Sequence, residues 1–105
     1  MQKYGKLAFN DDEVTYTYNG TEYRLAFHPY EPCLYICIGD DIIYVLHNAF
    51  TTYQLKEAFT EGKTVNDFGR EYDEEGFCKV LAAFLDSGRT DMDFFYAAKL
   101  VEDMM

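Results

Sequence analysis

The sequence predicts an α+β fold, with an antiparallel sheet of four to five strands in the N-terminal half and two to three helices in the C-terminal half, packed on one face of the sheet. Two hairpin signals precede residue 50, and apolar residues at helical spacing follow it. Strands that all precede the helices indicate an antiparallel sheet rather than alternating β-α-β units. A chain of 105 residues has the length of one domain, residues 1–105.

The first predicted hairpin is VTYTYNGTEYRLAF, which turns at Asn19-Gly20. A two-residue type I′ turn needs a positive φ at both central residues, and Asn-Gly tolerates this best. The turn places Tyr16 opposite Tyr23, so that one face of the hairpin is apolar and aromatic while the other is polar. This pattern indicates a half-buried pair of strands. We expect a short preceding strand around residues 7–9 in the same sheet.

The second predicted hairpin is YICIGDDIIYVL, with residues 39–41 (GDD) as a three-residue loop. In that register Cys37 faces Ile43 and Cys33 faces His47. Both faces of this hairpin are largely apolar, which predicts strands that are central to the sheet or covered on both sides.

Helical signals begin after the second hairpin. Thr51 and Gln54 have the spacing of a capping box, which predicts a helix through about Glu61. Residues 64–72 (TVNDFGREY) are expected to form one short turn, with Thr64 as its cap.

Two further helices are predicted in the last third of the chain. Asp73 is the expected N-cap of the longer one, and Gly88 is suited to the position just beyond its end. Thr90 with Asp93 is expected to start the last helix. The apolar stripe of that helix consists of Phe94, Ala97, Ala98 and Val101.

The chain is strongly acidic. It has 19 acidic and 9 basic residues, a net charge of −10, and the excess is spread over both halves. A field of this sign repels nucleic-acid phosphates and attracts basic surfaces. Direct binding of nucleic acid is therefore disfavoured, and a basic protein surface is the favoured partner.

The cellular location of the protein is predicted from its apolar runs, its first residues and its cysteine count. No apolar run approaches the roughly 20 residues that a membrane span needs. The first residues, MQKYGKLAFNDDE, have no apolar stretch like that of a secretory signal. Three cysteines cannot all pair within one chain, unlike the even sets of secreted domains. We expect a cytoplasmic protein.

The GDD loop invites comparison with metal-dependent phosphoryl transfer. That chemistry needs several converging carboxylates and a groove for an anionic substrate. The charge of −10 opposes such a groove. Gly and Asp are also the residues that a tight turn uses, so a structural turn is the favoured interpretation.

Cys33 and His47 are the candidates for a metal site because they face each other across two strands. Cys37 cannot share an ion with Cys33, since four residues of strand separate them by roughly 13 Å. The same pair could form an activated thiol, with Asp40 or Asn48 as a third member, although nothing in the sequence selects either. No CxxC, GxSxG or phosphate-binding glycine motif is present, and we identify no catalytic residue and no cofactor.

The favoured function is therefore a non-enzymatic interaction module that docks on a basic protein surface. Ten tyrosines supply interface anchors, and carboxylates around them select a basic partner. Inhibitors that mimic nucleic-acid charge share this size and acidity, so a nucleic-acid-binding protein is a candidate partner. The alternative is a small-ligand or metal-binding domain near Cys33 and His47. The expected partner-binding residues are Tyr30, Glu31, Tyr72, Asp73, Glu74 and Glu75.

Overall fold

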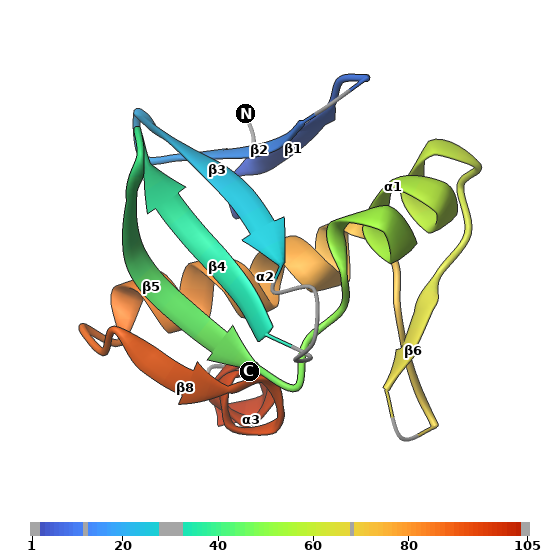
Figure 1. The fold of residues 1–105 in the computed structure, drawn as a ribbon. Coiled ribbons are helices and arrows are strands. Elements are labelled where there is room, and N and C mark those ends of the chain that lie inside the picture. The colour runs from blue at the N-terminus through green and yellow to red at the C-terminus, as the bar shows by residue number, and fades with distance from the viewer. Residues whose placement is uncertain (1–2, 12, 28–32, 68, 104–105) are drawn as a thin grey trace.

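The computed structural model describes residues 3–11, 13–27, 33–67 and 69–103. Its main sheet has six strands in the order β1-β2-β3-β4-β5-β8, and β6 and β7 form a separate two-stranded sheet (Figure 1). The strands are β1 (Lys6–Phe9), β2 (Val14–Tyr18), β3 (Thr21–Phe27), β4 (Cys33–Ile38), β5 (Asp41–His47), β6 (Val65–Asp67), β7 (Arg70–Tyr72) and β8 (Asp91–Asp93). The helices are α1 (Thr52–Thr60), α2 (Glu74–Asp86) and α3 (Phe94–Asp103).

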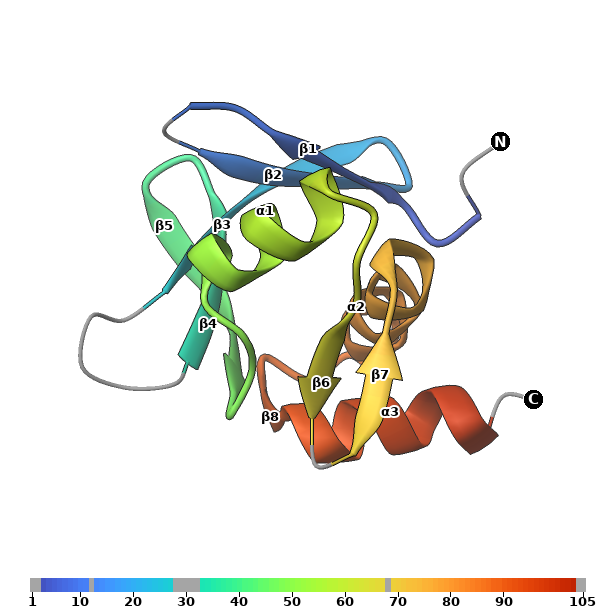
Figure 2. The same ribbon diagram turned by 90° about the vertical axis from the view of Figure 1, so that its right-hand side faces the viewer.

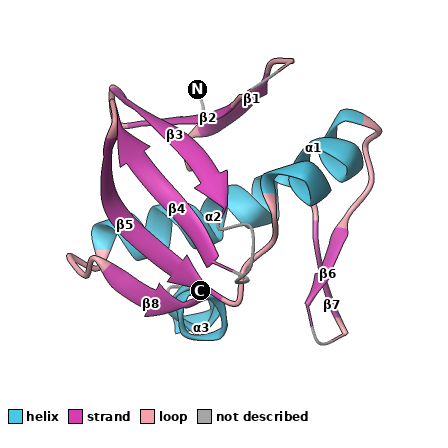
Figure 3. Ribbon diagram, viewed as in Figure 1, coloured by secondary structure: helices cyan, strands magenta, loops and turns pink. Residues whose placement is uncertain are grey.

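The predicted α+β class is confirmed. The main sheet is antiparallel from β1 to β5, and the three helices lie on one side of it (Figure 2). Figure 3 shows the strands of the main sheet in magenta and the helices in cyan, and strands β1 to β5 all precede the first helix in the chain. One strand more than expected joins this sheet, because β8 returns from the C-terminal half and pairs in parallel with β5.

The first hairpin has the predicted register. Tyr16 pairs with Tyr23, and Asn19 and Gly20 have φ values of 50° and 80°. The preceding strand β1 also forms and pairs with β2.

The second hairpin agrees with the prediction at its open end and differs at its tip. Cys33 pairs with His47 as expected, but Cys37 pairs with Ile42 and not with Ile43. The loop has two residues rather than three, and its Gly39 has a φ of 61°, as the first central residue of a type II′ turn requires. A bulge restores the register further along the strands.

The predicted helix caps of α1 and α2 are confirmed. Thr51 and Gln54 form both hydrogen bonds of a capping box, at 3.1 and 2.9 Å. Asp73 caps α2 by accepting a hydrogen bond of 2.7 Å from the backbone N–H of Gly76.

Two local predictions are wrong. Residues 64–72 do not form a short turn capped by Thr64: they contain the β6–β7 hairpin, which pairs Val65 with Tyr72. Residues 91–93 form β8 rather than the start of a helix, and the Thr90 carbonyl accepts a hydrogen bond of 2.8 Å from the N–H of Val45. Pairing with β5 outweighs the capping preference of Thr90, because tertiary contacts override local propensity.

The sheet has two different sides. Its core face, covered by the helices, contributes Tyr16, Leu25, Leu34, Ile36 and Leu46 to the hydrophobic core. Its outer face carries the alternate residues of the same strands, and no described helix covers it (Figure 1). Among the described residues, no helix has both the length and the apolar character required to cross a membrane.

Candidate functional site

Three side chains form a continuous chain of contacts across the outer face. Cys33 lies on β4, His47 is its cross-strand partner on β5, and Asp91 lies on the neighbouring strand β8. The Cys33 Sγ atom is 3.3 Å from Nδ1 of His47, and Nε2 of His47 is 2.9 Å from Oδ1 of Asp91. We call these three residues the thiol cluster.

Sequence reasoning found the first two members of the thiol cluster and missed the third. Of the two residues considered for that role, Asn48 donates a hydrogen bond to Asp93 instead, and Asp40 lies in the loop at the far end of the β4–β5 hairpin. Asp91 was overlooked because residues 90–93 were assigned to a helix start. A parallel strand that returns from the C-terminal half gives no local signal in the sequence.

The geometry of the thiol cluster is unsuited to a metal ion held by all three residues. The two ring nitrogens of an imidazole point in opposite directions, and here Cys33 lies at one and Asp91 at the other. Metal ligands must instead converge on one point, at roughly 2.0–2.3 Å for zinc. Among the described residues, no group of three or more His, Cys, Asp or Glu side chains is arranged to hold a metal.

The three residues of the thiol cluster differ in their exposure to solvent. Cys33 is buried, with 7% of its surface exposed, whereas the side chains of His47 and Asp91 are 41% and 68% exposed. An open groove of about 1080 Å³ runs along β8 and α3 and is lined by His47 and Asp91 but not by Cys33. Its other lining residues include Arg89, Tyr96 and Lys99.

The tip of the β4–β5 hairpin forms a second unusual surface. Ile38, Ile42 and Ile43 are exposed there, Ile42 to 55%. Asp40 and Asp41 are exposed between them. We call these five residues the hairpin tip.

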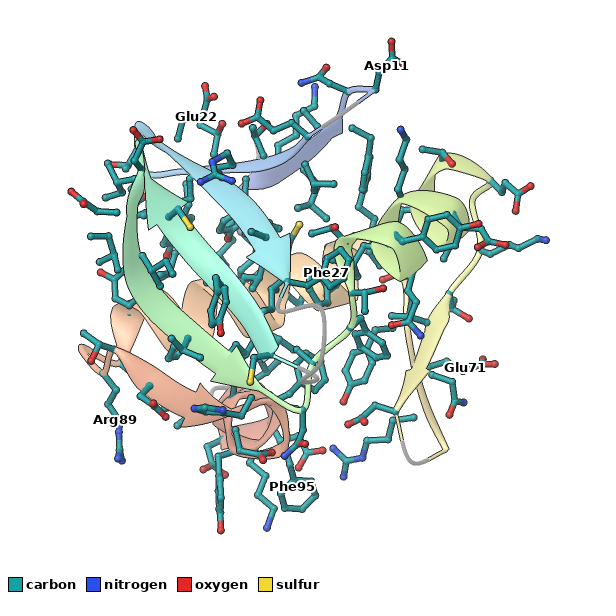
Figure 4. All side chains as sticks on the ribbon, in the orientation of Figure 1. Asp11, Glu22, Phe27, Glu71, Arg89 and Phe95 are labelled. Carbon is teal, nitrogen blue, oxygen red and sulfur yellow. The ribbon has the colours of Figure 1, made fainter. Side chains whose placement is uncertain are left out.

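Strand pairing brings a further carboxylate to this end of the sheet. Arg24 of β3 pairs with Cys37 of β4, and the two strands are antiparallel. Glu22, two residues before Arg24, therefore lies beside the hairpin tip, as Figure 4 shows. The sequence predicted that the strands of this hairpin are central to the sheet or covered on both sides, and it did not identify the three isoleucines as exposed.

The six residues predicted to bind a partner fall into three groups. Tyr30 and Glu31 lie outside the described residues. Tyr72 packs its ring edge-on against Phe94, with 5.4 Å between ring centroids, and Asp73 is the cap of α2. Glu74 and Glu75 are exposed in the first turn of α2.

Two ionisable groups in the core have shifted pKa values. Burial raises the pKa of the Cys78 thiol to about 12, with a smaller contribution from the negative charge of Glu74. Burial also raises the pKa of Tyr16, whose hydroxyl donates to the backbone carbonyl of Tyr4 and lies 3.4 Å from that of Cys78. Both groups are therefore neutral at physiological pH.

Comparison with known proteins gives no match to this chain, whether by family models, curated sequences or solved structures.

Proposed function

We propose that this chain is a non-enzymatic interaction module that docks on a basic protein surface through its hairpin tip. The observation that carries the proposal is the presence of three exposed isoleucines beside two exposed carboxylates at the end of one hairpin. Apolar side chains supply contact area on binding, and a carboxylate rim selects a positively charged partner and steers its approach.

Local charge supports this choice of surface. Asp40, Asp41 and Glu22 are exposed at the same end of the sheet. The nearest cation on β3, Arg24, already lies 4.0 Å from Glu13. The carboxylates of the tip thus add to the field of a chain whose net charge is −10. A nucleic-acid-binding protein presents a basic surface of the required kind.

A pull-down from native lysate with a salt gradient tests the proposal. We expect the wild-type chain to retain basic proteins at low salt and to release them as salt rises, because screening weakens attraction between exposed charges. The variant D40N/D41N should lose this retention. The control variant E57Q/E71Q removes the same charge from exposed positions elsewhere and should retain the partner; Glu71 lies far from Glu22 in Figure 4.

Two further comparisons sharpen the same experiment. The variant E74Q/E75Q tests the surface predicted from the sequence, and a loss of retention in this variant alone would move the docking site to α2. Added DNA should displace a nucleic-acid-binding partner. Retention that is indifferent to salt and to every variant would contradict the charge-driven proposal.

A small-ligand domain is the second candidate, and the groove beside His47 favours it. The groove of about 1080 Å³ combines the cations Arg89 and Lys99 and the aromatic ring of Tyr96 with the carboxylates of Asp91, Asp93 and Asp103. A ring-containing ligand that carries both positive and negative groups would match these side chains. Elemental analysis of the purified chain separates this candidate from a metal site. Stoichiometric zinc would favour a metal site at Cys33 and His47 over both the interaction module and the small-ligand domain.

A further inference from the structure

The thiol cluster has the order of groups that activates a cysteine. A carboxylate can only accept hydrogen bonds, so Asp91 Oδ1, at 2.9 Å, requires the proton of the neutral His47 ring on Nε2. This leaves the lone pair of Nδ1 facing the Cys33 sulfur at 3.3 Å. The tautomer that Asp91 selects is therefore the one that can accept the thiol proton.

Proton transfer within this arrangement produces a nucleophile. When the Cys33 proton moves to Nδ1, the products are a thiolate and an imidazolium, and Asp91 stabilises the imidazolium through the hydrogen bond from Nε2. The two partners of the ring come from different strands, Cys33 from β4 and Asp91 from β8, and each contacts the ring from a separate side. The geometry supports one function for the ring, that of a base oriented by a carboxylate.

Burial limits what this thiolate can reach. Cys33 is only 7% exposed and does not line the groove beside His47. A peptide or other large substrate bound in the groove would meet His47 and Asp91 before the sulfur. A reagent of a few atoms is better matched to such a thiol. Small hydroperoxides are of this size and react with thiolates rather than with thiols.

We propose that Cys33 is a peroxide-reactive cysteine, activated by His47 and positioned by Asp91, which small hydroperoxides oxidise to sulfenic acid. The thiolate sulfur attacks one peroxide oxygen, and the O–O bond breaks. The leaving hydroxide takes the proton from Nδ1 of His47 and departs as water. The sulfur loses two electrons and the peroxide gains them, so thiol plus hydroperoxide gives sulfenic acid plus water, or an alcohol for an alkyl hydroperoxide.

Reversal requires a second thiol from outside the chain. Cys37 lies four residues along the same strand, roughly 13 Å away by strand rise, which is beyond the reach of a disulfide. Cys78 lies in the core on the helical side of the sheet. A low-molecular-weight thiol would condense with the sulfenic acid, forming a mixed disulfide and releasing water. This inference does not depend on the docking function proposed above.

The test measures oxidation of each cysteine separately. The intact chain is treated with hydrogen peroxide in the presence of a 1,3-dione that traps sulfenic acid, and fragment-ion mass spectrometry locates the adduct. Cys33 should be trapped first. Cys37 and Cys78, both also buried, serve as internal controls for general accessibility.

Variants then separate activation from simple exposure. H47Q should slow the oxidation of Cys33 about tenfold or more, because an ordinary thiol is only a few per cent ionised near neutral pH. D91N should slow it by a smaller factor. D93N is the matched control: it removes the same charge from β8 at the residue that pairs with His47 along the strands, but the Asp93 carboxylate accepts its hydrogen bonds from Asn48 and from the N–H of Phe95.

The outcomes are decisive in both directions. The ordering wild type and D93N fastest, D91N intermediate and H47Q slowest supports the proposal. Oxidation of Cys33 that is no faster than that of Cys37, or equal in wild type and H47Q, would overturn it. Thermal melts check that the variants fold, which we expect because His47 and Asp91 are substantially exposed.

Discussion

The two consecutive hairpins of the sheet, β2–β3 and β4–β5, differ in what determines their structure. In β2–β3 the Asn19-Gly20 turn and one apolar face agree, and the register has no bulge. In β4–β5 both faces are apolar, the register shifts at a bulge, and isoleucines are exposed at the tip. When a strand has apolar residues on both faces, the apolar pattern no longer defines a unique register.

The two hairpins also differ in how much of their apolar surface is buried. The β2–β3 hairpin places Tyr16 fully inside the core, where its hydroxyl meets backbone carbonyls. The β4–β5 hairpin leaves Ile42 more than half exposed. We infer that the first hairpin contributes mainly to stability, and that the tip of the second is available to a partner.

The largest expected effect comes from truncating the buried ring of the first hairpin. Y16A should lower the free energy of unfolding by about 3–5 kcal/mol, because it leaves a cavity and removes a buried aromatic side chain. I42S at the hairpin tip should change the same free energy by no more than about 0.5 kcal/mol. Urea unfolding followed by circular dichroism measures both values. A similar loss of unfolding free energy in Y16A and I42S would contradict the proposed difference between the two hairpins.

The next effect is a loss of stability at alkaline pH. The folded pKa of Cys78, about 12, exceeds the unfolded value of roughly 8.5, so the fold favours the neutral thiol. The stabilisation is complete below the unfolded pKa and should fall by about 1.4 kcal/mol per pH unit as pH rises from there toward 12. Tyr16 adds to this loss only above roughly pH 10, the ordinary pKa of tyrosine.

The control for the alkaline effect is C78A, which removes the thiol. Between about pH 8.5 and 10, its free energy of unfolding should fall less steeply than that of the wild type. The comparison uses slopes, so the small cavity in the variant does not affect it. Parallel slopes would assign the alkaline loss to another group.

The smallest effect concerns the two turns. Gly20 and Gly39 both have positive φ, at 80° and 61°, and a Cβ added to either would meet open space. Each Gly→Ala change should therefore cost only the conformational penalty of about 1–2 kcal/mol. Both G20A and G39A should lower stability, while partner retention should fall only in G39A, which distorts the hairpin tip. An equal loss of partner retention in G20A and G39A would show that binding does not depend on the hairpin tip.

The limits of prediction from this sequence follow from which signals are local. The Asn19-Gly20 turn and the caps at Thr51 and Asp73 depend on residues within a few positions of one another, and all were predicted correctly. The β6–β7 hairpin was missed because residues 64–72 were assigned to a single turn capped by Thr64. Strand β8 was missed because its partner is distant in the sequence.

The candidate site divides in the same way. The pairing of Cys33 with His47 follows from a single hairpin and was predicted. Asp91 is brought to that pair by a parallel contact between β5 and β8, which no local pattern encodes. The exposure of Ile42 depends on the bulge and on which elements stop short of the tip, and both are properties of the whole fold.

The parallel pairing of β8 with β5 has a consequence for the order of assembly. Strands β1 to β5 pair with their neighbours in sequence, and such contacts form at little entropic cost. Asp91 is synthesised far later than His47 and reaches it only when β8 docks. A chain still emerging from the ribosome can thus bring Cys33 beside His47 while the carboxylate is absent. The reactivity of one thiol would then report whether synthesis and folding of the C-terminal segment are complete.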